Sequence, residues 1–139
     1  MEKFVKVTKK ELERRFNEYN DLYFEGQLPC PKRFELWTIQ TKCVGWVRAV
    51  WDRRTRAFDT IFHINARLYR WTDENLRSVM VHEMIHMYIE DYMRPVRWWH
   101  WIFPPKQHDS MFVKVMNDLN ERYGLNIGVR AKQMRAYRR

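Results

Sequence analysis

Cysteine is scarce in this chain, which contains only Cys30 and Cys43 among its 139 residues. Two cysteines are too few for a disulfide framework, and their spacing is not that of a zinc-binding cysteine pair. We therefore expect both thiols to be reduced, and the composition excludes a disulfide-rich secreted domain.

Long hydrophobic runs and a secretory leader are also missing. No apolar stretch approaches the roughly 18 residues that a membrane span requires. Residues 1–6 lack the apolar core of a secretory signal. We expect a protein that is not secreted and has no membrane partner, located in the cytoplasm or on the nucleoid.

Internal repeats and low-complexity segments are absent from the sequence as well, which favours a single globular unit. A chain of this length can bury about two-thirds of its unfolded surface in one core. The hydrophobic fraction of 45% and the aromatic fraction of 16% are typical of a folded protein rather than a disordered one. We predict one domain over residues 1–128, followed by a tail of residues 129–139.

Acidic residues are outnumbered by basic ones, and 26 Lys and Arg against 17 Asp and Glu give a formal net charge of +9. The tail holds part of this excess and contains no acidic residue. Its basic residues are Arg130, Lys132, Arg135, Arg138 and Arg139. A basic terminal arm indicates a polyanionic partner, most often nucleic acid, in single-stranded or duplex form. The alternative is a solvated tail that only aids solubility.

The periodicity of apolar residues predicts an α+β fold. A capping box of Thr8 and Glu11 precedes apolar residues at helical spacing, which predicts a first helix that stops at Gly26. Three short segments rich in aromatic and β-branched residues then predict a small, mainly antiparallel sheet of about three strands. These segments are 34–40, 43–51 and 58–65.

Two further helices follow the predicted sheet. Thr72 begins the second helix, with acidic residues in its first turn, and Pro95 marks the latest point at which it ends. Apolar residues from Phe112 onward predict a third amphipathic helix, which is closed by Gly124.

The second helix carries the sequence His82-Glu83-Met84-Ile85-His86. Residues four apart are neighbours on a helix, so His82 and His86 can share one metal ion while Glu83 reaches a water beside it. Residues 76–89 are apolar nearly all the way round, which is typical of a buried helix. Two buried imidazoles and a buried carboxylate are costly unless they are paired, and a divalent ion satisfies all three. We predict a zinc site with a general base, suited to peptide hydrolysis.

A catalytic zinc ion usually takes three protein ligands, so one more is needed. The candidates are His63, Glu90, His100 and His108. His63 lies in a predicted strand and fits an ordinary core or edge histidine, whereas Glu90 lies on the motif helix, nearly on the side of Glu83. Spacing leaves His100 and His108 open. His108 is favoured, because a helix start is a more rigid platform than a tryptophan-rich loop.

That loop, residues 94–107, combines basic and aromatic side chains, among them Arg94, Arg97, Trp98 and Trp99. One interpretation is that the tryptophan rings cover the core beside the active site. The other is that some rings stay exposed and stack on unpaired bases, flanked by the two arginines. These four residues are therefore candidate nucleic-acid contacts.

Several pieces of sequence flank the zinc motif in a definite order. They are Phe16-Asn17, Tyr23-Phe24-Glu25-Gly26-Gln27-Leu28, Cys43-Val44-Gly45, Ile64-Asn65 with Leu68, and His108 through Phe112 and Asn117 to Gly124-Leu125-Asn126-Ile127. In this order and spacing, from about Leu12 to Ile127, the chain resembles the SprT-like metalloproteases, the family of Spartan. The flanking pieces make the resemblance more specific than the zinc motif alone.

The resemblance implies a zincin-like fold and a ligand set. In that family the histidine at the head of the last helix is the third zinc ligand, which corresponds to His108 and leaves His100 in a loop insertion. Family likeness also implies DNA-stimulated cleavage of proteins that are bound or crosslinked to DNA. The chain departs from the family pattern at Asp109, where many members have glycine, and in the length and tryptophan content of the loop 94–107.

With this ligand set, His82, His86 and His108 hold one Zn²⁺ ion as neutral imidazoles, and Glu83 takes a proton from the attacking water and delivers it to the leaving amine. Candidates for stabilising the oxyanion are Tyr88, Tyr92 and Arg94. Two alternatives remain at this point. One is a DNA-independent zinc protease with a specific protein substrate, and the other is a DNA-binding module with a non-catalytic zinc, against which Glu83 argues.

Overall fold

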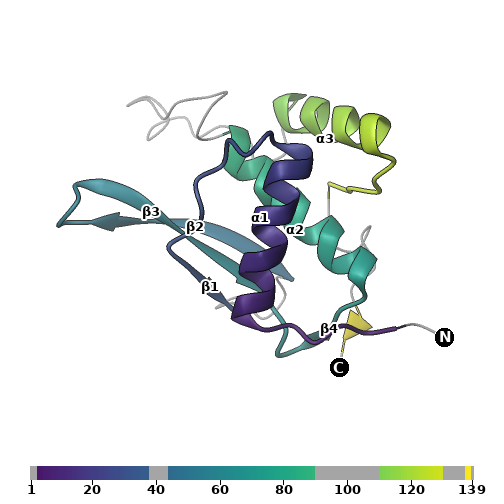
Figure 1. The fold of residues 1–139 in the computed structure, drawn as a ribbon, viewed down its shortest axis with the longest axis horizontal. Coiled ribbons are helices and arrows are strands. Elements are labelled where there is room, and N and C mark those ends of the chain that lie inside the picture. Colours follow the sequence, from purple (N-terminus) through teal and green to yellow (C-terminus); the bar gives the residue numbers. More distant parts are fainter. Residues whose placement is uncertain (1–2, 38–43, 90–109, 130–136, 139) are drawn as a thin grey trace.

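The computed structural model describes residues 3–37, 44–89, 110–129 and 137–138 (Figure 1). Its elements are α1 (Lys9–Tyr23), β1 (Arg33–Glu35), β2 (Gly45–Asp52), β3 (Ala57–Ile64), β4 (Tyr69–Arg70), α2 (Asp73–Tyr88), α3 (Ser110–Tyr123) and β5 (Tyr137–Arg138). The α+β class and the three helices predicted from the sequence are confirmed. Within the described residues, no helix is both long enough and apolar enough to cross a membrane.

The main sheet has three strands in the order β1-β3-β2. The long pair, β2 with β3, is antiparallel and runs from Gly45 opposite Ile64 to Asp52 opposite Ala57. The short β1 pairs with β3 in parallel, so the sheet is mixed. Strand β1 ends at Glu35, earlier than the predicted strand over residues 34–40.

Two short strands were not predicted. β4 pairs antiparallel with β5, which places Tyr69 opposite Arg138 and Arg70 opposite Tyr137. A single antiparallel bridge pairs Phe4 with Thr72, which follows β4 in the sequence. Figure 1 shows β5 and the segment before α1 at the same end of the molecule, beside the start of α2. Part of the basic tail therefore returns to the folded domain.

The core lies between the sheet and the helices α1 and α2 (Figure 1). Its centre is a cluster of three aromatic rings, Phe16 of α1, Phe34 of β1 and Phe62 of β3, with centroids 5.7 to 6.0 Å apart. Edge-to-face and tilted pairs of this kind stabilise a core beyond the area that they bury. Far from this cluster, the β2–β3 hairpin extends past the helices, and Trp51 near its tip is exposed.

The helix starts follow from local capping. The hydroxyl of Thr8 accepts a hydrogen bond from the backbone N–H of Glu11, and the hydroxyl of Thr72 accepts one from Asn75, each at 3.1 Å. These bonds satisfy backbone donors that the first helical turn leaves without intrahelical partners. Both predicted helix starts are confirmed.

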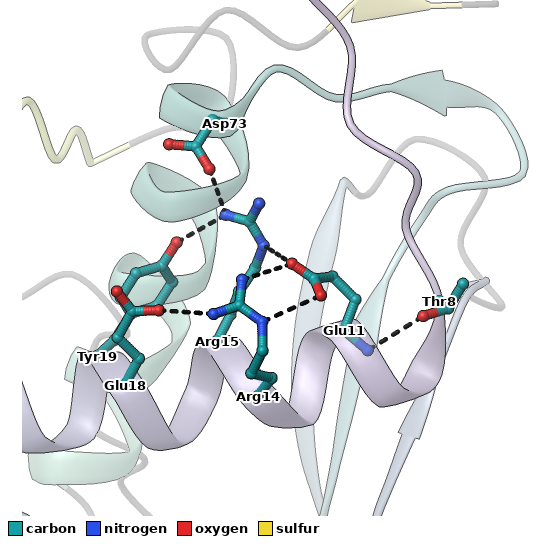
Figure 2. Close-up of polar contacts among 7 residues, drawn as sticks. All are labelled: Thr8, Glu11, Arg14, Arg15, Glu18, Tyr19 and Asp73. Carbon is teal, nitrogen blue, oxygen red and sulfur yellow. Dashed lines mark hydrogen bonds and ion pairs between the residues drawn. The ribbon is translucent and has the colours of Figure 1, made fainter.

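Arg15 joins α1 to the first turn of α2. Its side chain is 7% exposed and donates to Glu11 Oε1 at 3.0 Å, to the Tyr19 hydroxyl at 3.0 Å and to Asp73 Oδ1 at 2.7 Å (Figure 2). Burial raises the pKa of Tyr19, so its hydroxyl stays protonated beside the guanidinium. This network holds the N-terminal end of α2, the helix that carries the zinc motif.

Candidate metal centre

The zinc motif lies on the buried helix α2, as predicted. Val79, Met80, Met84 and Ile85 are at most 1% exposed, and the motif residues His82 and Glu83 are 6% and 9% exposed. The helix is covered by the sheet, by α1 and by α3. A buried helix restrains its side chains, so the histidines and the carboxylate have few alternative positions.

The two histidines lie side by side. The rings of His82 and His86 have centroids 5.1 Å apart and planes inclined by 75°. The ring of Phe112, in the first turn of α3, lies 5.0 Å from the ring of His82 and 4.7 Å from that of His86. Phe112 is completely buried, so the beginning of α3 is packed against the motif.

A backbone carbonyl decides the tautomer of His82. The Nδ1 atom of His82 lies 2.8 Å from the carbonyl oxygen of Gly128. A carbonyl can only accept, so Nδ1 carries the proton and the lone pair is on Nε2. Histidines that bind metals commonly donate their other ring N–H in this way. Sequence reasoning did not find this partner, because it lies 46 residues away and no motif marks it.

Glu83 is a carboxylate in an apolar setting. Burial raises its pKa from 4.5 to about 8, because removal from water disfavours the charged form. One of its oxygens, Oε1, lies 4.0 Å from His82 Nε2, the ring nitrogen that bears the lone pair. A divalent cation beside these atoms would favour the carboxylate and lower its pKa.

Gly45 brings β2 close to the motif helix. A Cβ atom at this position would lie 2.8 Å from Cγ1 of Val79 and 3.5 Å from Cγ of Glu83. The first distance is shorter than real Cβ contacts, so only glycine allows the strand to approach this closely. Gly45 was one of the residues that carried the family resemblance, but its role is visible only in the structure.

A comparison with protein families matches the SprT-like family over residues 12–131. The chain belongs to the SprT-like family. Comparisons with curated proteins and with solved structures found no match. Membership supports a protease-type function of the SprT kind, since the family is of metalloprotease type and associated with zinc.

In this member of the SprT-like family, His63 is a structural histidine, as expected. It lies in β3 and is 1% exposed. Its Nδ1 atom donates to the carbonyl of Trp37 at 2.8 Å, and its Nε2 atom accepts from Nε of Arg48 at 3.0 Å. The ring also stacks on Trp46, with centroids 5.4 Å apart. Burial is the main cause that lowers the pKa of His63. Both ring nitrogens are thus hydrogen-bonded, one to Arg48 of β2 and the other to Trp37 after β1.

The remaining predicted site residues fall mainly outside the described part of the chain. They are Glu90, Tyr92, Arg94, Arg97, Trp98, Trp99, His100, His108, Arg130, Lys132, Arg135 and Arg139. The backbone of Arg138 is described, in β5. The ring of Tyr88 lies against Phe24, with centroids 5.7 Å apart.

The described residues fit part of a SprT-like zinc site. They provide two adjacent imidazoles, one of them with its tautomer set, and a buried carboxylate nearby. Among the ranges that the structure describes, no group of three or more His, Cys, Asp or Glu side chains is arranged to hold a metal. A catalytic zinc ion at this place would take a further protein ligand from outside these ranges.

Proposed function

We propose that the protein is a zinc-dependent endopeptidase of the SprT type. The observation that carries this proposal is the combination of His82 and His86 on one buried helix face with Glu83 beside them. The hydrogen bond from His82 Nδ1 to Gly128 supports it further, because metal-binding histidines commonly donate one ring N–H in this way, and Nε2 would then be the atom to bind the metal. A purely structural zinc site needs no buried base next to its ligands.

His108 is the third ligand in this proposal. It precedes α3, which begins at Ser110. The contacts of Phe112 with both motif rings support the assignment, because they bring the start of α3 to the two histidines. A helix start also offers a rigid platform for a ligand.

The zinc ion, when bound, supplies a Lewis acid that polarises the scissile carbonyl and makes a water easier to deprotonate. Glu83 accepts the proton from the attacking water and later gives it to the leaving amine. Its apolar surroundings raise the affinity of the carboxylate for a proton, and a bound cation would offset part of this effect.

An extended peptide alongside β2 is the substrate that this geometry favours. β2 is an outer strand of the described three-stranded sheet. At its first residue, Gly45, a Cβ atom would lie 2.8 Å from Cγ1 of Val79 and 3.5 Å from Cγ of Glu83, so this end of the strand lies next to the motif helix. A peptide that adds to the edge of β2 by backbone hydrogen bonds would therefore lead its scissile bond toward Glu83. Such pairing recognises the backbone and tolerates many side chains.

We further propose that DNA stimulates cleavage and that proteins bound or crosslinked to DNA are the substrates. The net charge of +9 supports phosphate contacts. The candidate contacts remain Arg94, Arg97, Trp98 and Trp99 together with the basic residues of the tail. A DNA-independent protease is the competing function.

One assay tests both parts. Zinc-loaded wild type and Glu83→Gln are incubated with a DNA-binding protein, without DNA, with single strands or with duplex. We expect wild-type cleavage to rise with DNA, with single strands at least as effective as duplex, and Glu83→Gln to cleave at least about 100-fold more slowly. Undiminished cleavage by zinc-loaded Glu83→Gln would refute the role of Glu83. Wild-type cleavage that is equal with and without DNA would leave the DNA-independent protease.

A further inference from the structure

We infer that Asn120 is a positioning residue for the metal ligand His82, acting through the backbone of residues 127–128. Asn120 lies in the last turn of α3, and its side chain is hydrogen-bonded to Ile127. The inference rests on the proposed function, because it concerns the affinity of the same site for zinc. Its first readout, the tautomer of His82, is nevertheless independent of zinc.

The side chain of Asn120 holds Ile127 by both backbone groups. Its amide donates to the carbonyl of Ile127 at 3.0 Å, and its carbonyl oxygen accepts from the N–H of Ile127 at 2.8 Å. The chain reaches this arrangement through Gly124, whose φ of +65° ends α3. Ile127 is 4% exposed, so its side chain is buried while its backbone is bonded to Asn120.

This double hydrogen bond orients the carbonyl that meets His82. The carbonyl of Ile127 and the N–H of Gly128 belong to one planar peptide unit, which the bond from Asn120 holds in place. Only two backbone rotations, both within Gly128, separate that plane from the Gly128 carbonyl. Glycine restricts these rotations less than any other residue. The direction of the carbonyl therefore depends on how firmly the preceding peptide is held.

Loss of this orientation should act on the metal through His82. Without the Gly128 acceptor, His82 gains freedom to place its proton on either ring nitrogen and to rotate its ring. A neutral imidazole with its proton on Nε2 presents no lone pair at that atom. Changes to the hydrogen-bond partners of metal-binding histidines typically reduce metal affinity by about 10-fold to 100-fold.

The chain contains a matched control. Asn20 of α1 makes the same double hydrogen bond to the backbone of Leu28, at 2.9 and 3.1 Å, and is followed by Gly26 with a φ of +68°. The side chain of Asn20 is hydrogen-bonded to Leu28, which belongs to the segment after α1. Asn20→Ala therefore reports the structural cost of losing such a bond pair, whereas Asn120→Ala reports that cost together with any effect on His82.

The experiment compares wild type, Asn20→Ala, Asn120→Ala and Asn120→Asp. The Asp variant keeps the size of the side chain and the acceptor for the Ile127 N–H, but it removes the donor to the Ile127 carbonyl. Nitrogen-15 NMR of the metal-free proteins reports the tautomer of His82. Competition with a chelator reports the dissociation constant for zinc. Urea unfolding reports the global stability of each variant.

We expect Asn120→Ala to bind zinc about 10-fold to 100-fold more weakly and to lose the single Nδ1–H tautomer of His82. Asn120→Asp should show a smaller change in the same direction and serves as the test if the alanine variant does not fold. Asn20→Ala should keep the wild-type tautomer and zinc affinity. Wild-type values of both quantities in the Asn120 variants would overturn the inference, as would equal losses in Asn20→Ala. A wild-type protein that binds zinc but cleaves no protein would refute the proposed function alone.

Discussion

Replacement of Glu83 by Gln should remove a pH-dependent loss of stability from the metal-free protein. Burial raises the pKa of Glu83 from 4.5 to about 8. The folded protein therefore keeps the proton over a range in which the unfolded chain releases it. The contribution of Glu83 to the unfolding free energy is fully present below pH 4.5, and it is lost as the pH rises toward 8. Glutamine has no proton to lose, so the variant lacks this loss.

The magnitude follows from the two pKa values. Between these two pKa values, each rise of one pH unit lowers the unfolding free energy by about 1.4 kcal/mol. The loss between pH 5 and pH 8 is therefore about 3 to 4 kcal/mol. A typical domain has a total unfolding free energy of about 5 to 15 kcal/mol. The change is therefore a large fraction of the whole and should be measurable by urea unfolding.

The assay compares the unfolding free energies of wild type and Glu83→Gln at pH 5 and pH 8, with a chelator present. The difference between the two proteins cancels the titration of every group that they share. Glu121→Gln, at an exposed position of α3, serves as the control for replacing a carboxylate by an amide at the surface. Zinc should shrink the effect of Glu83→Gln, because a nearby cation favours the carboxylate. A wild-type minus Glu83→Gln difference that stays constant from pH 5 to pH 8 would refute the reasoning.

Three further predictions concern the ligand set, the contact between β2 and α2, and DNA. His108→Ala should lose the zinc ion and His100→Ala should keep it, and metal analysis of the purified variants decides between them. Gly45→Ala should destabilise the fold by about 1 to 3 kcal/mol in urea unfolding, because its Cβ would meet Val79 at 2.8 Å; wild-type stability would contradict the close approach of β2. Replacing Arg130, Lys132 and Arg135 by Gln should flatten the dependence of log affinity for single-stranded DNA on log salt by about 2 units, if each contacts a phosphate. An unchanged slope would exclude these residues as phosphate contacts.

Local features of this protein were predictable from the sequence because their causes lie within a few residues. The caps at Thr8 and Thr72 join residues three apart, and His82 and His86 are neighbours because a helix turns once in 3.6 residues. The apolar surroundings of the motif likewise predicted a buried helix. The structural role of His63 followed from its place in a predicted strand, although its partners did not.

The pairing of distant segments was not predictable in the same way. Hydrophobic periodicity reports which face of an element is apolar, but not which other element covers that face. The parallel pairing of β1 with β3 and the return of β5 to β4 are contacts of this kind. The tail was predicted as a separate basic arm, and β5 shows that backbone pairing holds part of it against the domain.

By itself, the sequence determined the composition of the candidate site, namely two imidazoles and a carboxylate on one helix, because helical geometry links residue spacing directly to direction. Only the tertiary structure decided which other residues surround these three side chains. The Gly128 carbonyl on His82, the ring of Phe112 against both histidines, and the approach of Gly45 to Glu83 join segments far apart in the chain. Their positions depend on how α2, α3 and the sheet pack together, and that packing is a property of the whole core rather than of any local pattern.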